Sequence, residues 1–502
     1  MIGVLAFDRD SFVKTATAII LTAAFSLTSS LFAAEPTALG KLPAGPASVT
    51  ISVKSQPRQT FSGFGTSCFG DGDYVRLAPE RRAELNDLVW REARFNTARI
   101  WLRLKRYAPV SGERRFKEAF PDSVAAQVRD AQAAGARHLV LGPCAIPDYL
   151  IERLPVKGDD GNGQRIEPYL KSDRFDEHAA MIADFVRDLR DQNGIAIEAT
   201  GIQNEPNDPD DCVFTPEDVA RSVKLLRAAL NSRGLDDVKV IAPESVGCNA
   251  PAFAQLTALR DDPAAWNALG GLASHSYDGG ADGRWAETAL ASGKNYWMTE
   301  FCLGGPEDPG DFFRASAEAA AFLSDVNHGV SCWIHFIGYL SDDPNDNGTR
   351  LIAYYNGVPA GKPWLKLFEP YNYLKELGRT FDAGAVFRKS VSSLEEEMTW
   401  TRGSKPRLIV ASARNPDGAW GIGISDYTSN DFPAKFWYPG QPAQSFTATV
   451  VIEELSTAGE TPFALRRLGP QLQEPQQENT MMHSGRLTVA INPLELVTLR
   501  SR

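Results

Sequence analysis

The chain has 502 residues, of which 43% are hydrophobic and 23% charged, and its formal net charge is −11. This composition is that of a folded protein with a sizeable core, and the length suits one large domain together with a smaller one. The negative net charge argues against a nucleic acid partner, because a protein that binds a phosphate backbone needs a basic surface.

Residues 1–34 have the pattern of a secretory signal peptide. Lys14 precedes an uncharged run of apolar and small residues that ends at Ala33 and Ala34. Such a run, closed by small residues, is typical of a cleaved leader. A retained membrane-spanning helix is the less favoured alternative, since the run contains several Thr and Ser residues. We therefore expect an exported protein, secreted or periplasmic, that is not held at a membrane once the leader is removed.

Residues 61–380 alternate between apolar, β-rich runs and amphipathic helical stretches. The helix expected at residues 175–191 begins after a cap at Ser172 or Asp173, and the helix at 215–233 opens on Thr215. Alternation of this kind indicates a parallel sheet, and eight strand–helix units close it into a (β/α)8 TIM barrel. The eight strands are expected at residues 61–68, 97–103, 138–142, 197–204, 238–243, 272–277, 295–300 and 330–336.

From residue 381 the helical periodicity stops and short alternating runs take over. Turns such as the one at residues 415–418 separate these runs, which is typical of an antiparallel β-sandwich. The stretch 48–54 has the same two-residue period. The domains are therefore expected at 61–380 and 381–502, with the segment 35–60 contributing an edge strand to the second, and the fold class is α/β.

Two glutamates stand where expected barrel strands end. Glu205 lies in an Asn-Glu-Pro tripeptide after strand four, and Glu300 ends strand seven. Active sites of such barrels are built at the carboxyl ends of the strands. Enzymes that cleave glycosidic bonds place two carboxylates across the sugar, about 5 Å apart for retention and about 6.5–9.5 Å apart for inversion. The pair therefore predicts a glycosidase site.

Several motifs in this order resemble glycoside hydrolase family 30, which belongs to a clan of retaining barrel glycosidases. The resemblance runs from about Ile51 to the C-terminus and implies retaining hydrolysis of β-linked glycans of the β-glucan, xylan or galactan class, with no metal and no organic cofactor. The motifs are Gln-Thr-Phe-Ser-Gly-Phe-Gly at 59–65, Arg-Ile-Trp at 99–101, Gln-Asn-Glu-Pro at 203–206, His-Ser-Tyr at 275–277, Met-Thr-Glu-Phe at 298–301, and three C-terminal stretches at 366–374, 381–386 and 492–499.

The chemistry assigns the glutamates different roles. Glu300 is expected to attack the anomeric carbon, and Glu205 to donate a proton to the leaving oxygen. The charge on Glu300 would help to keep Glu205 protonated, because two neighbouring carboxylates resist joint ionisation. Asn204 is expected to bind the 2-hydroxyl group of the sugar.

Four further residues are expected at the substrate. Arg99 and Tyr277 are candidates to hydrogen-bond Glu300, although Arg99 in an ordinary barrel ion pair is an alternative. His275 is expected to contact Tyr277 or Glu205. Trp333 would form a floor on which a sugar ring stacks, unless it is a core aromatic residue.

Two other classes of protein remain open. One is a barrel that binds carbohydrate without catalysis, and the intact pair of glutamates argues against it. The other is an isomerase or lyase, which would need a phosphate-binding loop or metal ligands after the last strands. The sequence does not choose among the β-glycans, between endo and exo action, or among oligomeric states.

Two features concern disulfides and metals. Six cysteines allow fifteen disulfide connectivities, and a partly reduced set is an equal alternative. The loop 343–348 matches the first half of a calcium-binding loop, but Tyr354 occupies the place of the bidentate glutamate, so a polar turn is favoured. The cysteines are Cys68, Cys144, Cys212, Cys248, Cys302 and Cys332.

Overall fold

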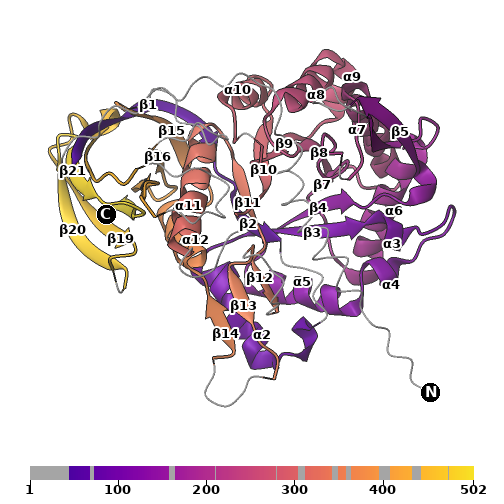
Figure 1. Ribbon diagram of the computed structural model, residues 1–502, viewed down its shortest axis with the longest axis horizontal. Helices are drawn as coiled ribbons and strands as arrows, with labels where there is room; N and C mark the ends of the chain where they lie inside the picture. The colour runs from indigo at the N-terminus through magenta and orange to yellow at the C-terminus, as the bar shows by residue number, and fades with distance from the viewer. Residues whose placement is uncertain are drawn as a thin grey trace.

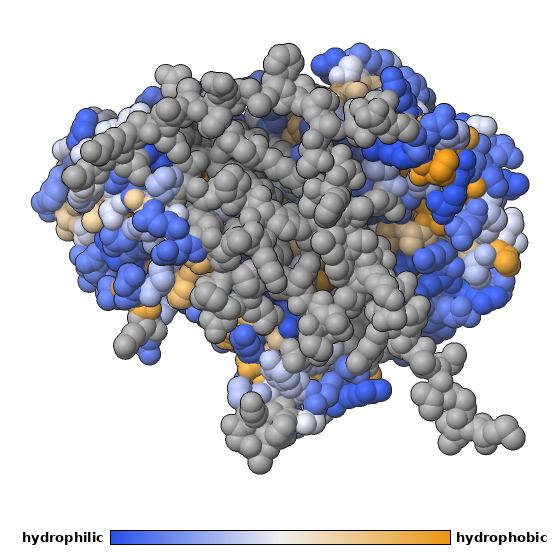
Figure 2. Space-filling model, in the orientation of Figure 1, coloured by the Kyte–Doolittle hydropathy of each residue, from blue (hydrophilic) through white to orange (hydrophobic). Residues whose placement is uncertain are grey.

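The computed structural model describes residues 45–67, 73–157, 164–209, 211–278, 280–303, 311–341, 349–357, 363–394, 407–431, 442–472 and 474–502. The expected leader, Cys68 and the loop 343–348, for which a polar turn was favoured over a calcium site, lie outside these residues. Within them, no helix is long and apolar enough to cross a membrane. The visible part of the described surface is mostly hydrophilic, with apolar side chains in small separate patches (Figure 2).

The first domain contains a closed barrel of eight parallel strands, as the sequence predicts. Strand four is shorter than expected, because the chain leaves the ladder after Gly201. In ladder order the strands are β2 (Gly63–Ser67), β3 (Thr97–Arg103), β4 (His138–Cys144), β7 (Ala199–Gly201), β8 (Lys239–Ser245), β9 (Gly271–His275), β10 (Asn295–Phe301) and β11 (Cys332–Phe336), and β11 pairs with β2.

Helices follow the barrel strands. The expected cap of the helix at 215–233 is confirmed, since the Thr215 hydroxyl accepts from the Asp218 N–H in a reciprocal capping box. The expected cap of the helix at 175–191 is wrong, because it begins after Arg174, which pairs with Glu177 instead. The helices are α2 (Pro79–Asn86), a π-helical turn η2 (Asp87–Glu92), α3 (Leu104–Tyr107), α4 (Phe116–Ala119), α5 (Asp122–Ala134), α6 (Phe175–Asn193), α7 (Pro216–Asn231), α8 (Ala250–Asp261), α9 (Pro263–Ala268), α10 (Gly283–Ala291), α11 (Asp311–Asn327) and α12 (Glu369–Thr380).

The second domain is built from nine strands around its own apolar core. They pair in the order β1-β15-β16-β17-β22-β19-β20-β21-β18, and β18 closes the ring on β1. Their bounds are β1 (Ala47–Thr60), β15 (Val386–Ser392), β16 (Leu408–Arg414), β17 (Trp420–Asp426), β18 (Phe446–Ile452), β19 (Glu460–Leu468), β20 (Gln476–His483), β21 (Arg486–Ile491) and β22 (Leu496–Ser501).

Strand β1 joins this domain, as the sequence predicts, but not at an edge. It pairs antiparallel with β15 on one side and parallel with β18 on the other. In Figure 1 the indigo strand runs along the orange and yellow strands of the C-terminal half. The expectation of an edge strand is therefore wrong, because both sides of the strand carry hydrogen-bonded neighbours.

Helix α11 stands between the barrel and the second domain (Figure 1). All of its residues from Phe313 to Asn327 are buried. Asn327 exchanges two hydrogen bonds of 2.9 Å with the backbone of Ser390, and Ser425 donates to the carbonyl of Ser316 at 3.2 Å. A helix buried on every side is a core element, and here it joins the two domains.

Two insertions form small sheets. One is the hairpin of β5 (Ile151–Lys157) and β6 (Gln164–Leu170), and the other contains β12 (Tyr339–Ser341), β13 (Ile352–Tyr354) and β14 (Leu365–Leu367). Residues 158–163, which connect β5 to β6 in the chain, lie outside the described residues. The five cysteines that the structure describes are all free thiols.

The capping box provides a test of local stability. Replacing Thr215 by Ala removes one partner of the exposed N–H groups of α7, which costs about 1 kcal/mol. We expect the melting temperature to fall by about 2 °C in a calorimetric scan. Thr257→Ala is the matched control, since Thr257 lies within α8 and bonds only the Phe253 carbonyl in its own helix. An equal loss in both variants would contradict the role of the cap.

Candidate active site

The two glutamates meet at the carboxyl end of the barrel. One carboxylate oxygen of Glu205, one of Glu300 and one ring nitrogen of His275 all lie within 4.8 Å of one another. The three residues are buried, with 1%, 4% and 0% of their surface exposed. The sequence-predicted pair is thus a pair in space.

Glu205 is held by the backbone of both neighbouring strands. After β7 the Asn204 N–H donates to the carbonyl of Pro143 at 2.7 Å, and the Glu205 N–H donates to the carbonyl of Glu244 at 3.0 Å. The backbone φ of Glu205 is +46°, a left-handed conformation that residues other than glycine seldom adopt. Such conformations persist where the surrounding structure fixes them, and they cluster at functional sites.

Glu300 reaches the same space through a bulge in β10. Met298 lies opposite Ser274 and Glu300 lies opposite His275, so Thr299 is an extra residue between the two pairs. A bulge changes the direction in which the following side chains point. As a result, the side chains of both Thr299 and Glu300 bond groups of the site, although they are neighbours in the chain.

The two carboxylates have different partners. His275 Nδ1 lies 2.8 Å from Glu205 Oε1. Tyr277 donates its hydroxyl to Glu300 Oε1 at 3.0 Å, and Arg99 Nη1 donates to Glu300 Oε2. Glu300 therefore has the partners of a charged carboxylate, whereas Glu205 lies against an imidazole.

The protonation of His275 follows from its burial. Burial lowers the pKa of the His275 imidazole to about 4, so the ring is neutral near pH 7. Burial also raises the pKa of the Glu300 carboxyl, and the Arg99 guanidinium and the Tyr277 hydroxyl act in the opposite direction. Arg99 therefore brings a full positive charge to Glu300, whereas the His275 ring beside Glu205 is neutral.

The same three residues have the ligand types of a metal site. Glu205, His275 and Glu300 form the one such group found among the described residues. Both oxygens of Glu300 already accept hydrogen bonds, and the Arg99 charge at this carboxylate would repel a cation. The geometry thus favours two hydrogen-bonded carboxylates over a metal centre.

Trp333 does not join this cluster, and the expected sugar floor is wrong at this position. Its neighbours Cys332 and Ile334 belong to the small core inside the barrel, so Trp333 points outward. It is fully buried, packs 5.7 Å from the ring of Phe322 on α11, and donates its Nε1–H to Asp325 at 2.9 Å.

Three residues of the site, Glu244, Thr299 and Trp101, were not assigned to it from the sequence. Glu244, at the end of β8, accepts from Arg99 Nη2 at 2.8 Å and from the Thr299 hydroxyl. Trp101 is half-buried at the barrel mouth, 4.3 Å beneath the Arg99 guanidinium. The signal that pointed to Glu205, a carboxylate just past an apolar run, also holds for Glu244 in Ala-Pro-Glu-Ser.

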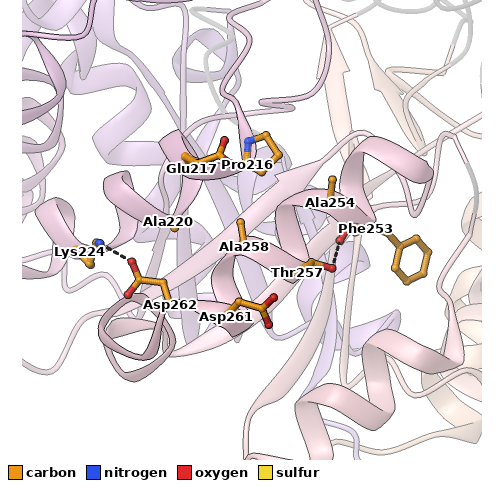
Figure 3. Close-up of a pocket in the computed structure, with 10 residues that line it drawn as sticks. All are labelled: Pro216, Glu217, Ala220, Lys224, Phe253, Ala254, Thr257, Ala258, Asp261 and Asp262. Carbon is orange, nitrogen blue, oxygen red and sulfur yellow. Dashed lines mark hydrogen bonds and ion pairs between the residues drawn. The ribbon is translucent and has the colours of Figure 1, made fainter.

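A separate groove of about 780 Å³ lies on the outer helical layer, between α7 and α8 (Figure 3). Glu217 and Lys224 line it from α7, and Phe253 and Asp261 from α8. None of its lining residues belongs to the cluster around Glu205 and Glu300.

Known structures share this architecture. No family model and no curated protein matches the sequence. A GH30 endoxylanase from Clostridium papyrosolvens C71 superposes with a TM-score of 0.62 at 17% identity, covering 91% of this chain and 100% of that chain. The chain has the fold of GH30 enzymes. The predicted resemblance to family 30 is therefore confirmed at the level of the fold.

Two further solved structures agree with this GH30 fold. SrfJ from Salmonella typhimurium has a TM-score of 0.65 at 17% identity, covering 92% of this chain and 94% of that chain. The endo-β-1,6-glucanase BT3312 has a TM-score of 0.59 at 16% identity, covering 90% and 93%. The two-domain arrangement thus recurs in proteins of very different sequence.

The observed burial of Trp333 against α11 provides a test. Replacing Trp333 by Phe leaves the buried Asp325 without one donor, which costs about 2 kcal/mol. We expect a clearly lower melting temperature for this variant in a thermal scan. Trp364→Phe, at a half-buried position where Arg81 lies over the ring, is the control and should melt close to the wild type. A Trp333→Phe variant of wild-type stability would contradict this placement.

Proposed function

We propose that the chain is an exported retaining glycoside hydrolase that cleaves β-linked glycans, with Glu205 as acid/base and Glu300 as nucleophile. The observation that carries the proposal is the separation of the two carboxylates, whose oxygens lie within 4.8 Å. Retaining enzymes hold these groups about 5–5.5 Å apart, whereas inverting enzymes leave about 6.5–9.5 Å for a water molecule.

The reaction has two displacements. In the first, a Glu300 oxygen forms a bond to the anomeric carbon while the bond to the leaving oxygen breaks, and Glu205 gives its proton to that oxygen. In the second, Glu205 takes a proton from a water molecule, whose oxygen attacks the anomeric carbon. The bond to Glu300 breaks, and both glutamates return to their starting states.

The neighbouring residues orient the reacting groups. Tyr277 and Arg99 each bond one oxygen of Glu300 and fix the plane of the nucleophile. Asn204 Oδ1 accepts from Arg99 Nη2 at 3.2 Å, which leaves its amide group as the donor for the sugar 2-hydroxyl. The neutral imidazole of His275 holds Glu205 toward the leaving group without adding a charge.

The proposed substrate class is supported by the descriptions of known proteins that share this fold. One is described as an endoxylanase and another as an endo-β-1,6-glucanase. We propose a polysaccharide or oligosaccharide of the β-glucan, xylan or galactan class. The half-buried ring of Trp101, beside Arg99, offers an apolar face for a sugar.

The first experiment is hydrolysis of a substrate panel by the wild type. The panel holds 4-nitrophenyl β-glucoside, β-xyloside and β-galactoside, together with β-1,6-glucan, xylan and galactan. Proton NMR of the first product should show the β-anomer, because two displacements retain configuration. An α-anomer would contradict retention, and silence across the panel would favour a carbohydrate-binding barrel without catalysis.

Two variants separate the roles of the glutamates. Glu300→Gln removes the nucleophile, and we expect the rate to fall about 10⁴-fold on every substrate. Glu205→Gln should cost about 10²–10⁴-fold on polysaccharides, which need a proton on the leaving oxygen. It should cost much less in the first step on a 2,4-dinitrophenyl glycoside, whose leaving group needs none. Equal losses on both kinds of substrate would contradict the assignment of Glu205.

The pH dependence should be sensitive to Asp211, a carboxylate beside the acid/base. Burial, together with the charges of Glu205 and Asp208, raises the pKa of Asp211 to about 7. Its carboxylate accepts from Gln203 Nε2 at 2.8 Å. Above pH 7 its charge disfavours ionisation of Glu205, which preserves the acid.

Asp211→Asn therefore shifts the basic limb of kcat/KM to lower pH, by about half a unit. The measurement is a pH profile from 4 to 9 on the best panel substrate. Asp278→Asn, which changes an acidic residue whose carboxylate accepts from Asn249 at 2.7 Å, is the control. A shift to higher pH in Asp211→Asn would contradict the electrostatic argument.

A further inference from the structure

Beneath the nucleophile the barrel holds an ion pair that the proposed reaction does not yet use. Arg99 and Glu244 are both fully buried, and their Nη2 and Oε2 atoms are 2.8 Å apart. The other terminal nitrogen of Arg99 bonds Glu300. One guanidinium thus pairs with two carboxylates, of which Glu300 is a reacting group in the proposed mechanism and Glu244 is not.

The neighbouring strands are shaped to make room for this pair. A Cβ atom added to Gly142 on β4 would lie 2.9 Å from Arg99 Nε. A Cβ atom added to Gly201 on β7 would lie 2.8 Å from Glu244 Oε2. Since any side chain at either position would collide with the pair, both glycines serve the close approach of these charged groups.

Glu244 also connects to both halves of the site. Its Oε1 accepts from the hydroxyl of Thr299, the bulged residue next to the nucleophile. Its backbone carbonyl accepts from the N–H of Glu205 at 3.0 Å. Its own φ is +66°, where β8 shifts register against β9. Glu244 is thus held in place from β3, β7, β8 and β10.

The charges change during the proposed reaction. Before it, Arg99 faces two negative carboxylates. In the covalent intermediate Glu300 is an ester and carries no charge, so among the described residues Glu244 is the carboxylate that still pairs with Arg99. A buried guanidinium without a carboxylate is strongly destabilising, because no water compensates its charge.

We propose that Glu244 is a positioning residue that neutralises Arg99 while Glu300 is esterified, and that it thereby allows the covalent intermediate to form in a buried site. The role of Glu244 during esterification of Glu300 rests on the proposed function. The sharing of the Arg99 charge between Glu244 and Glu300 rests on the structure alone. Glu244 also limits how much of the Arg99 charge acts on Glu300, which preserves the nucleophilicity of that carboxylate.

The shared charge is tested without a substrate, by thermal unfolding of the full chain. Glu300→Gln and Glu244→Gln each leave Arg99 with one carboxylate, and each should lower the melting temperature modestly. The double variant leaves Arg99 with none. Its melting temperature should fall by at least about twice the sum of the single losses, since the two residues share one partner.

A rescue variant separates charge from packing. Adding Arg99→Met to the double variant removes the unpaired cation and should recover most of the lost melting temperature. It also covers the case in which the double variant does not fold. The control cycle pairs Glu244→Gln with Glu376→Gln, whose buried carboxylate bonds Arg466 and Thr498, and should be additive. Additive losses in the Glu244–Glu300 cycle, or no rescue, would overturn the proposal.

A kinetic experiment measures how fast the covalent intermediate forms and breaks down in Glu244→Gln. The full Arg99 charge then acts on Glu300, which makes it a weaker nucleophile and a better leaving group. With a 2,4-dinitrophenyl glycoside of the sugar that the wild type cleaves, the first step should slow by about tenfold or more. The burst of dinitrophenol should disappear because the second step is no longer limiting.

An unchanged burst in that variant would overturn the role of Glu244 in the reaction. A wild type that cleaves no glycoside would refute the proposed function instead. The result of the unfolding cycle would stand in either case, so the two failures are distinguishable.

Discussion

The guanidinium of Arg99 is the charge around which the barrel mouth is organised. It has no exposed surface, and a buried cation of this kind persists only where carboxylates surround it. Glu244 and Glu300 supply those carboxylates, Asn204 adds an amide oxygen, and Gly142 and Gly201 leave the space. The positions of five strands are therefore coupled through one side chain.

The same constraint explains why the backbone is irregular at the site. Regular parallel strands present every second side chain to the barrel interior. Glu244 and Glu300 reach Arg99 only because β8 and β10 each shift register against β9. The bond between Glu244 and Thr299 connects the two irregular segments across β9. The unusual backbone conformations are thus the means by which two carboxylates meet one cation.

The wall of this site is continuous with the core of the molecule. Ser276, between His275 and Tyr277, donates to Asp325 of the buried helix α11 at 2.8 Å. Trp333 donates to the same carboxylate, and α11 in turn contacts the second domain through Asn327. The residues that hold the two glutamates are therefore supported by packing that extends through both domains.

The sequence predicted what depends on local pattern. Glu205 and Glu300 could be found because each ends an apolar run, and the capping box at Thr215 was visible as a short motif. Glu244 was missed because its strand was expected to end at Pro243, and a bulge has no clear sequence signal. Trp333 was misplaced because the direction of a strand side chain depends on register, and β1 was taken for an edge strand because its partners lie hundreds of residues away.

The place of β1 has a consequence for the order in which the chain folds. It precedes the other described strands in the chain, but β15 and β18, its hydrogen-bonding partners, belong to the last quarter of the chain. Contacts so distant in sequence form late and slowly. Until then both edges of β1 are open to pairing with other chains, a recognised route to aggregation. Three residues of β1 oppose such pairing, because Pro57 has no N–H to donate to another chain and Lys54 and Arg58 place charges on the strand.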